Sequence, residues 1–169
     1  KDHWFYINEF CCYITRKYKD GQAISKGYLK FMKNHEYLFK KARFLPTYSN
    51  YLYFSALTRD DEAFYSILKE FELFEKYPKV DLIYVLYIKY SRLLELHYQN
   101  NDLKSTEKLI GIVGDYYNAN YKSMGESQVN YTLFLLTRAC IETDQLNEAS
   151  DWLNTWNQAG VLEYTLIHY

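Results

Sequence analysis

The chain has 169 residues, of which 49% are hydrophobic and 20% aromatic, and its formal net charge is −1. This composition is too apolar for an intrinsically disordered chain, and the low counts of six glycines and two prolines argue against a protein of strands and tight turns. No apolar run approaches the roughly 18 to 20 residues that a membrane span needs, so we expect a soluble protein.

The first of four predicted helical hairpins covers residues 2–45, with Asp20-Gly21 as its turn. Residues 36–43 either continue its second helix or form a separate short one. Pro46 is expected to end this region, because a proline pushes the residue before it out of helical geometry. The first helix carries an apolar stripe at helical spacing, which we expect to face the core and which consists of Trp4, Ile7, Phe10 or Cys11, and Ile14.

The second and third hairpins are predicted over residues 47–77 and 80–119. Thr47 is expected to cap the second hairpin, whose polar elbow is Arg59-Asp60. The third hairpin contains Gly111 and Gly114, and this spacing occurs both at close helix crossings and in phosphate-binding loops. Because no strand precedes the glycines and no lysine follows in place, we interpret them as packing residues.

The fourth hairpin, predicted over residues 128–158, has the clearest pattern. Its first helix repeats apolar residues at helical spacing, and after the polar elbow at residues 142–145 a second apolar set contains the small residue Ala149. Residues 118–128, just before this hairpin, are expected to form the longest loop. Residues 161–169 read as the start of a further helix, so we expect the chain to be a piece of a longer one.

Similar polar elbows recur at intervals of 40, 43 and 43 residues, which predicts an all-α array of about four hairpins. The segment QLNEASDWL, with Ala149 followed four residues later by Leu153, resembles the second helix of tetratricopeptide-type repeats. The whole chain is similar to uncharacterised bacterial tetratricopeptide-like proteins. The resemblance implies an α–α superhelix and a cytoplasmic, non-catalytic scaffold that binds protein or peptide.

In such an array the first helices of the hairpins line the concave surface, where a partner would bind. Arginines there could hold a carboxylate, because a guanidinium offers paired donors in one plane, although ordinary ion pairs between helices are the plainer interpretation. The elbow register places the following polar residues on this surface: Asn8, Glu9, Arg16, Arg92, Glu95, Gln99, Arg138 and Glu142.

The sequence shows no pattern typical of a catalytic, metal or cofactor site, so we expect a protein that is not an enzyme and needs no cofactor. The four histidines are scattered without ligand spacing. The three cysteines, Cys11, Cys12 and Cys140, suit a reducing compartment better than a disulfide framework.

Ten lysines and arginines but only four acidic residues lie in residues 1–50. We interpret this excess as solvated helix faces rather than a nucleic-acid site, and its lysines include Lys26, Lys30, Lys33, Lys40 and Lys41. The alternative function is the peptide-sensing domain of a bacterial transcriptional regulator whose DNA-binding domain lies outside this chain. An unpaired apolar stripe at residues 161–169 would also make a homodimer plausible.

Overall fold

A computed structural model describes residues 2–77 and 80–159 of the chain. All regular elements in these ranges are helical, which confirms the predicted all-α class. The α-helices are α1 (Asp2–Ile14), α2 (Tyr18–Asn34), α3 (Phe44–Leu57), α4 (Asp61–Phe71), α5 (Leu82–Gln99), α6 (Leu103–Asn120), α7 (Glu126–Glu142) and α8 (Leu146–Gln158). Short 3-10 helices cover Glu36–Leu38, Lys41–Arg43, Glu72–Lys76 and Tyr121–Ser123.

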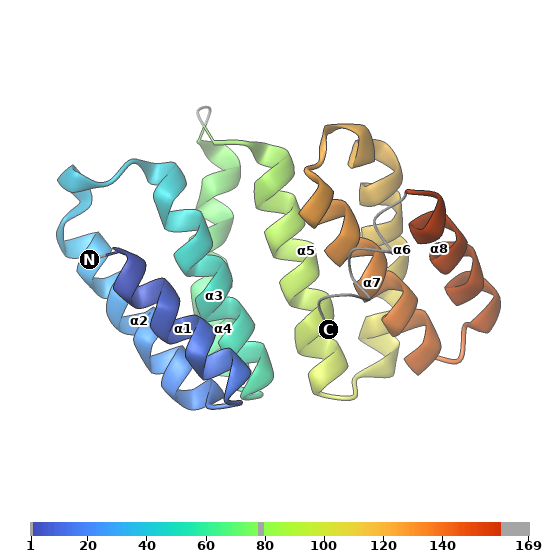
Figure 1. Cartoon of the computed structure of the whole chain (residues 1–169), viewed down its shortest axis with the longest axis horizontal. Coiled ribbons are helices and arrows are strands. Elements are labelled where there is room, and N and C mark those ends of the chain that lie inside the picture. The colour runs from blue at the N-terminus through green and yellow to red at the C-terminus, as the bar shows by residue number, and fades with distance from the viewer. Residues whose placement is uncertain (1, 78–79, 160–169) are drawn as a thin grey trace. The chain divides into compact units, whose positions relative to one another are not determined.

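The chain divides into two compact units, Lys1–Val85 and Leu86–Tyr169, and each contains two helical hairpins. In unit 1, α1 pairs with α2 and α3 with α4 (Figure 1). The core of this unit is rich in aromatic residues, with Tyr28, Phe64 and Phe71 almost fully buried. In unit 2, α7 and α8 form the corresponding pair, and aliphatic residues such as Leu133 and Leu136 fill the core.

All four hairpins turn in the same way. Each turn has one residue in the left-handed region, namely Arg16, Arg59, Asn101 and Asp144, with φ between 55° and 60°. After each of these residues, the next N–H donates to a carbonyl five residues back, as Lys17 does to Cys12 at 2.8 Å and Gln145 to Cys140 at 2.8 Å. This is the Schellman arrangement, which satisfies carbonyls at the end of a helix. The four turns are 43, 42 and 43 residues apart, so the hairpins repeat in structure as well as in sequence.

The predicted turn at Asp20-Gly21 is wrong, because these residues lie in the first turn of α2 and the chain reverses at Arg16 instead. Gly21 has a packing role. A Cβ atom at this position would lie 2.5 Å from Cε1 of Phe54, so only glycine lets the ring of α3 rest against α2.

The prediction that Pro46 and Thr47 separate two hairpins is also wrong. Pro46 lies in the first turn of α3, where helix N–H groups have no intrahelical partner and the missing donor of proline costs nothing. Residues 36–43 contain two 3-10 helices rather than an extension of α2. The predicted loop at residues 118–128 is largely helical as well, because α6 continues to Asn120 and α7 begins at Glu126.

The apolar stripe of α1 faces away from unit 1, contrary to the prediction. Trp4, Ile7, Phe10 and Ile14 are 59% to 62% exposed. The opposite side of α1 packs on the unit through Phe5, whose ring stacks on Tyr28 with centroids 4.1 Å apart. The helix therefore has two apolar faces, and the more regular one lies outside. The predicted helix at residues 161–169 lies beyond the described ranges.

Candidate functional site

The residues predicted for a groove in unit 2 form a seam between α5 and α7. Glu95 is 3% exposed and accepts a hydrogen bond from Gln99 Nε2 at 2.7 Å. Arg138 Nη1 lies 3.7 Å from Glu95 Oε2, and the guanidinium carbon of Arg138 lies 3.3 Å from the centre of the Tyr98 ring. Tyr98 also donates to Glu142 at 3.4 Å. Arg138 therefore already has a carboxylate and an aromatic partner within the unit.

Arg92 completes this seam. Its Nη1 donates to the hydroxyl of Tyr131 at 3.0 Å, and its guanidinium carbon lies 5.5 Å from the centre of that ring. Burial raises the pKa of Tyr131 to about 12, and Arg92 partly offsets this effect. At neutral pH the Tyr131 phenol therefore keeps its proton, and the Arg92 guanidinium donates to an uncharged hydroxyl oxygen. A binding role for these residues stays a prediction.

The predicted residues of unit 1 do not share one surface. Asn8 donates to the carbonyl of Trp4 at 2.6 Å. Glu9 is 4% exposed and accepts from Ser25 Oγ at 2.5 Å and Asn50 Nδ2 at 2.7 Å. Burial raises the pKa of Glu9, although both hydrogen bonds oppose the shift. Arg16 lies in the first hairpin turn and lines a hollow of about 470 Å³ beside Leu57 and the neighbouring basic residues.

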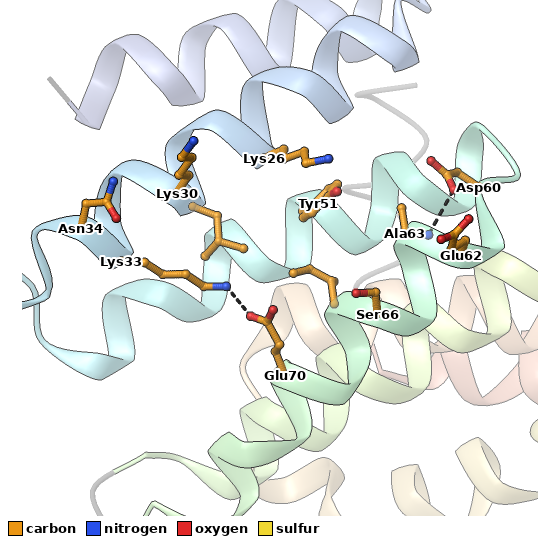
Figure 2. A pocket seen from close by; sticks show the side chains of 12 residues that line it. Lys26, Lys30, Lys33, Asn34, Tyr51, Asp60, Glu62, Ala63, Ser66 and Glu70 are labelled. Atoms are coloured by element: carbon orange, nitrogen blue, oxygen red, sulfur yellow. Dashed lines mark hydrogen bonds and ion pairs between the residues drawn. The ribbon is translucent and has the colours of Figure 1, made fainter.

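A cleft of about 540 Å³ lies between α2 and α4 in unit 1 (Figure 2). Leu29, Tyr51 and Ile67 are buried residues that form its apolar floor. Its walls are polar and are formed by Lys26, Lys30, Lys33 and Asn34 from α2, and by Asp60, Glu62, Ser66 and Glu70 from α4 and its N-terminal cap. The volume falls within the range of ligand-binding clefts.

Polar contacts between helices bound the cleft at both ends. At one end, Lys33 pairs with Glu70 (Figure 2). Glu70 also accepts from the Tyr48 hydroxyl at 3.1 Å. At the other end, Gln22 Nε2 donates to Asp60 Oδ2 at 2.9 Å, while Asp60 Oδ1 caps α4 by accepting from the N–H of Ala63 at 3.1 Å. These contacts hold α2 and α4 on either side of the cleft.

The charges that line the cleft balance in number, but the lysines lie on the α2 wall and the carboxylates on the α4 side. Glu70 is paired with Lys33, and Asp60 is occupied as a cap. Within the described ranges, Lys26 and Lys30 have no carboxylate partner, and they lie one helical turn apart on α2. Glu62 is the acidic lining residue left without a cation. The cleft therefore offers two adjacent ammonium groups above an apolar floor.

Sequence reasoning missed this cleft, although part of its signal was visible. Lys26, Lys30 and Lys33 follow the spacing of one helical face, and we interpreted them as a solvated face. The opposite wall could not be predicted, because it depends on how far α4 lies from α2 across α3. In the part of the chain that the structure describes, no three His, Cys, Asp or Glu side chains form a group that could hold a metal ion. No described helix is long and apolar enough to cross a membrane.

Comparisons of the chain with protein-family models, with curated proteins and with solved structures gave no match. The arrangement of side chains in the cleft is therefore the basis for assigning a function.

Proposed function

We propose that the chain is a non-catalytic helical-repeat module of the tetratricopeptide-like type, and that the cleft between α2 and α4 binds an acidic peptide segment. The observation that carries this proposal is the pair of unpartnered lysines, Lys26 and Lys30, beside a buried apolar floor. The regular repeat of the four hairpin turns supports the tetratricopeptide-like interpretation.

The spacing of the lysines suits a peptide with alternating acidic residues. Two helical residues four positions apart are separated by about 6 Å along the helix axis. In an extended peptide, side chains two residues apart point the same way and are separated by about 6.6 Å. Two carboxylates at positions i and i+2 can therefore reach Lys26 and Lys30 together, while the residue between them points to the opposite side.

The floor and the ends of the cleft supply the remaining contacts. Leu29, Tyr51 and Ile67 offer apolar area to a side chain of the bound segment. At one end of the cleft, Glu70 neutralises the charge of Lys33. A peptide carboxylate is therefore attracted to Lys26 and Lys30 rather than to Lys33. Binding of this kind depends on exposed charges, and we expect it to weaken as salt is added.

The test is fluorescence polarisation with a labelled peptide of alternating glutamate and leucine, alongside the same peptide with glutamine in place of glutamate. We expect the acidic peptide alone to bind, and the double variant Lys26→Glu and Lys30→Glu to weaken binding at least about tenfold. The matched control is Lys104→Glu with Lys108→Glu, because these exposed lysines are also four residues apart on one helix, α6, and do not line the cleft.

Equal binding of the two peptides would contradict the proposal, as would equal losses in the two double variants. Arg138→Ala provides a further comparison. If this variant lost binding while the cleft variant kept it, the site would be the seam between α5 and α7, as the sequence predicted.

A further inference from the structure

The exposed side of α1 is the largest row of uncovered apolar side chains on one described helix. Trp4, Ile7, Phe10 and Ile14 are each about 60% exposed, and they lie opposite the buried Cys12. Surfaces of this kind commonly mark contacts with another protein. The repeat itself indicates which partner fits, because the same positions in the second and fourth hairpins are already covered.

Positions are compared by counting back from the left-handed residue of each turn. Twelve, nine and six residues before the turn, α1 has Trp4, Ile7 and Phe10, and α3 has Thr47, Asn50 and Tyr53.

Each of these α3 residues contacts the preceding hairpin. Thr47 Oγ1 lies 3.4 Å from Met32 Sδ, Asn50 donates to Glu9, and the Tyr53 ring centre is 5.8 Å from that of Tyr13.

The same relation holds in unit 2. Counting back from Asp144, the equivalent residues of α7 are Thr132, Leu135 and Arg138. Thr132 and Leu135 are 2% and 3% exposed, and Arg138 contacts Glu95 and Tyr98 of the preceding hairpin. This face of a first helix is therefore where one hairpin packs on the hairpin before it, and in α1 it is uncovered.

The last described hairpin presents the complementary surface. Tyr13 and Tyr98, three residues before their turns, are the side chains that contact the next hairpin at Tyr53 and Arg138. The equivalent residue of the fourth hairpin is Ile141, which is 55% exposed.

A second position of the repeat, on the second helix of each hairpin, is also buried in the earlier hairpins and exposed in the fourth. Nine residues after the turn, Ser25, Leu68 and Ile110 are no more than 6% exposed in the first three hairpins, whereas Leu153 of α8 is 44% exposed.

We infer that the α1 face of one copy of this chain packs against the α7–α8 face of a second copy, so that hairpin stacking continues between molecules in a head-to-tail manner. The α1 face is formed by Trp4, Ile7, Phe10 and Ile14, and the α7–α8 face by Ile141 and Leu153. Inside the units, some of the corresponding contacts between hairpins are polar, such as that of Asn50 with Glu9. The residues that define the two exposed faces are all aliphatic or aromatic.

The apolar area of the α1 face is of the size that one side of a stable contact needs. With aromatic side chains of 150–250 Å² about 60% exposed, the α1 face offers on the order of 500 Å² of apolar surface. A standard interface buries about 800 Å² on each partner, of which roughly 60% is apolar. Because the two faces differ, the contact is heterologous, and it produces rings or open chains of molecules rather than a closed symmetric dimer.

The test is sedimentation velocity of the 169-residue chain between about 1 and 200 μM, with circular dichroism to confirm that each variant is folded. We expect the unaltered chain to form species larger than a dimer as its concentration rises. Phe10→Asp and Leu153→Asp should each sediment as a monomer when alone. The control Leu73→Asp replaces a leucine that is 53% exposed but lies on neither face, and it should associate like the unaltered chain.

An equimolar mixture of the two variants distinguishes this inference from other modes of association. The intact α1 face of Leu153→Asp can bind the intact α7–α8 face of Phe10→Asp, so the mixture should form a dimer and nothing larger. A monomeric unaltered chain at 200 μM would overturn the inference. Normal association of Leu153→Asp would overturn it as well, because α1 would then pair with α1 of the second copy.

Discussion

In unit 1 the first helices of the two hairpins are joined through a buried carboxyl group with neutral partners, whereas in unit 2 they are joined through a carboxylate paired with an arginine. Glu9 of α1 accepts hydrogen bonds from Ser25 and Asn50, and burial raises its pKa. Glu95 of α5 is as deeply buried, but Arg138 lies beside it. The two carboxyl groups do not occupy the same repeat position, because Glu9 lies seven residues before its turn and Glu95 lies six before its own. Each unit nevertheless buries a carboxyl group between its first helices and supplies the partners that make its burial tolerable.

The two units also fill an equivalent packing position in opposite ways. In unit 1, Gly21 on α2 leaves room for the large side chain of Phe54 on α3. In unit 2 the equivalent positions hold the larger Thr106 and the smaller Ala139, both at most 2% exposed. Pairing one small with one larger residue keeps the helices close in both units. A change at one member of the pair should therefore be felt strongly.

The largest expected effect tests this packing difference. Gly21→Leu should lower the free energy of unfolding by about 3 kcal/mol, because the new side chain would overlap the buried ring of Phe54. Gly27→Leu on the same helix is the matched control, since nothing beyond the local helix backbone lies within 4 Å of its Cβ position and leucine favours a helix over glycine. Urea denaturation followed by circular dichroism measures both. Equal stabilities of the two variants would show that Gly21 is not a packing residue.

The second prediction tests the hydrogen-bond hub of unit 1. Glu9→Ala should lower the free energy of unfolding by about 2 kcal/mol, because Ser25 and Asn50 lose their acceptor inside the unit. Asn8→Ala, whose side chain contacts only an exposed carbonyl of the same helix, serves as the control and should cost less than about 0.5 kcal/mol. The role of Glu9 as a hub would be refuted if both alanine variants unfolded at the same urea concentration.

The general architecture could be predicted because it depends on local patterns. Polar elbows such as Asn100-Asn101-Asp102 and Thr143-Asp144 stand between amphipathic segments, and the structure has its turns there. The first turn could not be located in this way. Glycine usually marks a turn, but here Gly21 is needed for packing and Arg16 takes the left-handed conformation.

The candidate site was harder to predict because it depends on contacts between distant segments. The lysines of α2 follow a visible helical spacing, but the carboxylates that neutralise or border them come from residues 60–70, across α3. Likewise, hydropathy alone could not show which of the two apolar faces of α1 packs on unit 1. Phe5, through its contact with Tyr28, determines the buried face, while the more regular stripe remains exposed.

The third prediction replaces a buried glutamate with glutamine in each unit and expects opposite changes in the free energy of unfolding. The raised pKa of Glu9 means that the unfolded chain releases this proton first as the pH rises above about 4.5, so Glu9 costs stability from that pH upward. Glu9→Gln stays neutral and keeps an acceptor for Ser25, and a flip of the Asn50 amide lets its oxygen accept from the new Nε2 group. The variant should therefore be more stable than the unaltered chain at pH 8 and lose this advantage below about pH 4.5. Glu95→Gln should instead lower stability at pH 8, by up to about 1 kcal/mol, because it removes the charged partner of Arg138, whose side chain is 27% exposed.

Urea denaturation of both variants at pH 4, 6 and 8 provides the measurement. The Glu9→Gln difference should grow with pH, since glutamine has no proton to release. A constant difference across this range would mean that Glu9 has the same pKa in the folded and the unfolded chain, and the contrast between the two units would disappear.

The smallest expected effect concerns the hairpin turns, which also differ between the units. Unit 1 places arginines at its two left-handed positions, while unit 2 places Asn101 and Asp144 there. The left-handed conformation costs an ordinary residue roughly 1–2 kcal/mol but is better tolerated by Asn and Asp. Arg59→Gly should therefore raise the free energy of unfolding by about 0.5 kcal/mol, since relief of the strain is partly offset by the greater freedom of glycine in the unfolded chain. Asn101→Gly should change the free energy of unfolding by less. A larger increase in this free energy for Asn101→Gly than for Arg59→Gly would show that side-chain contacts, rather than backbone conformation, set the stability of these turns.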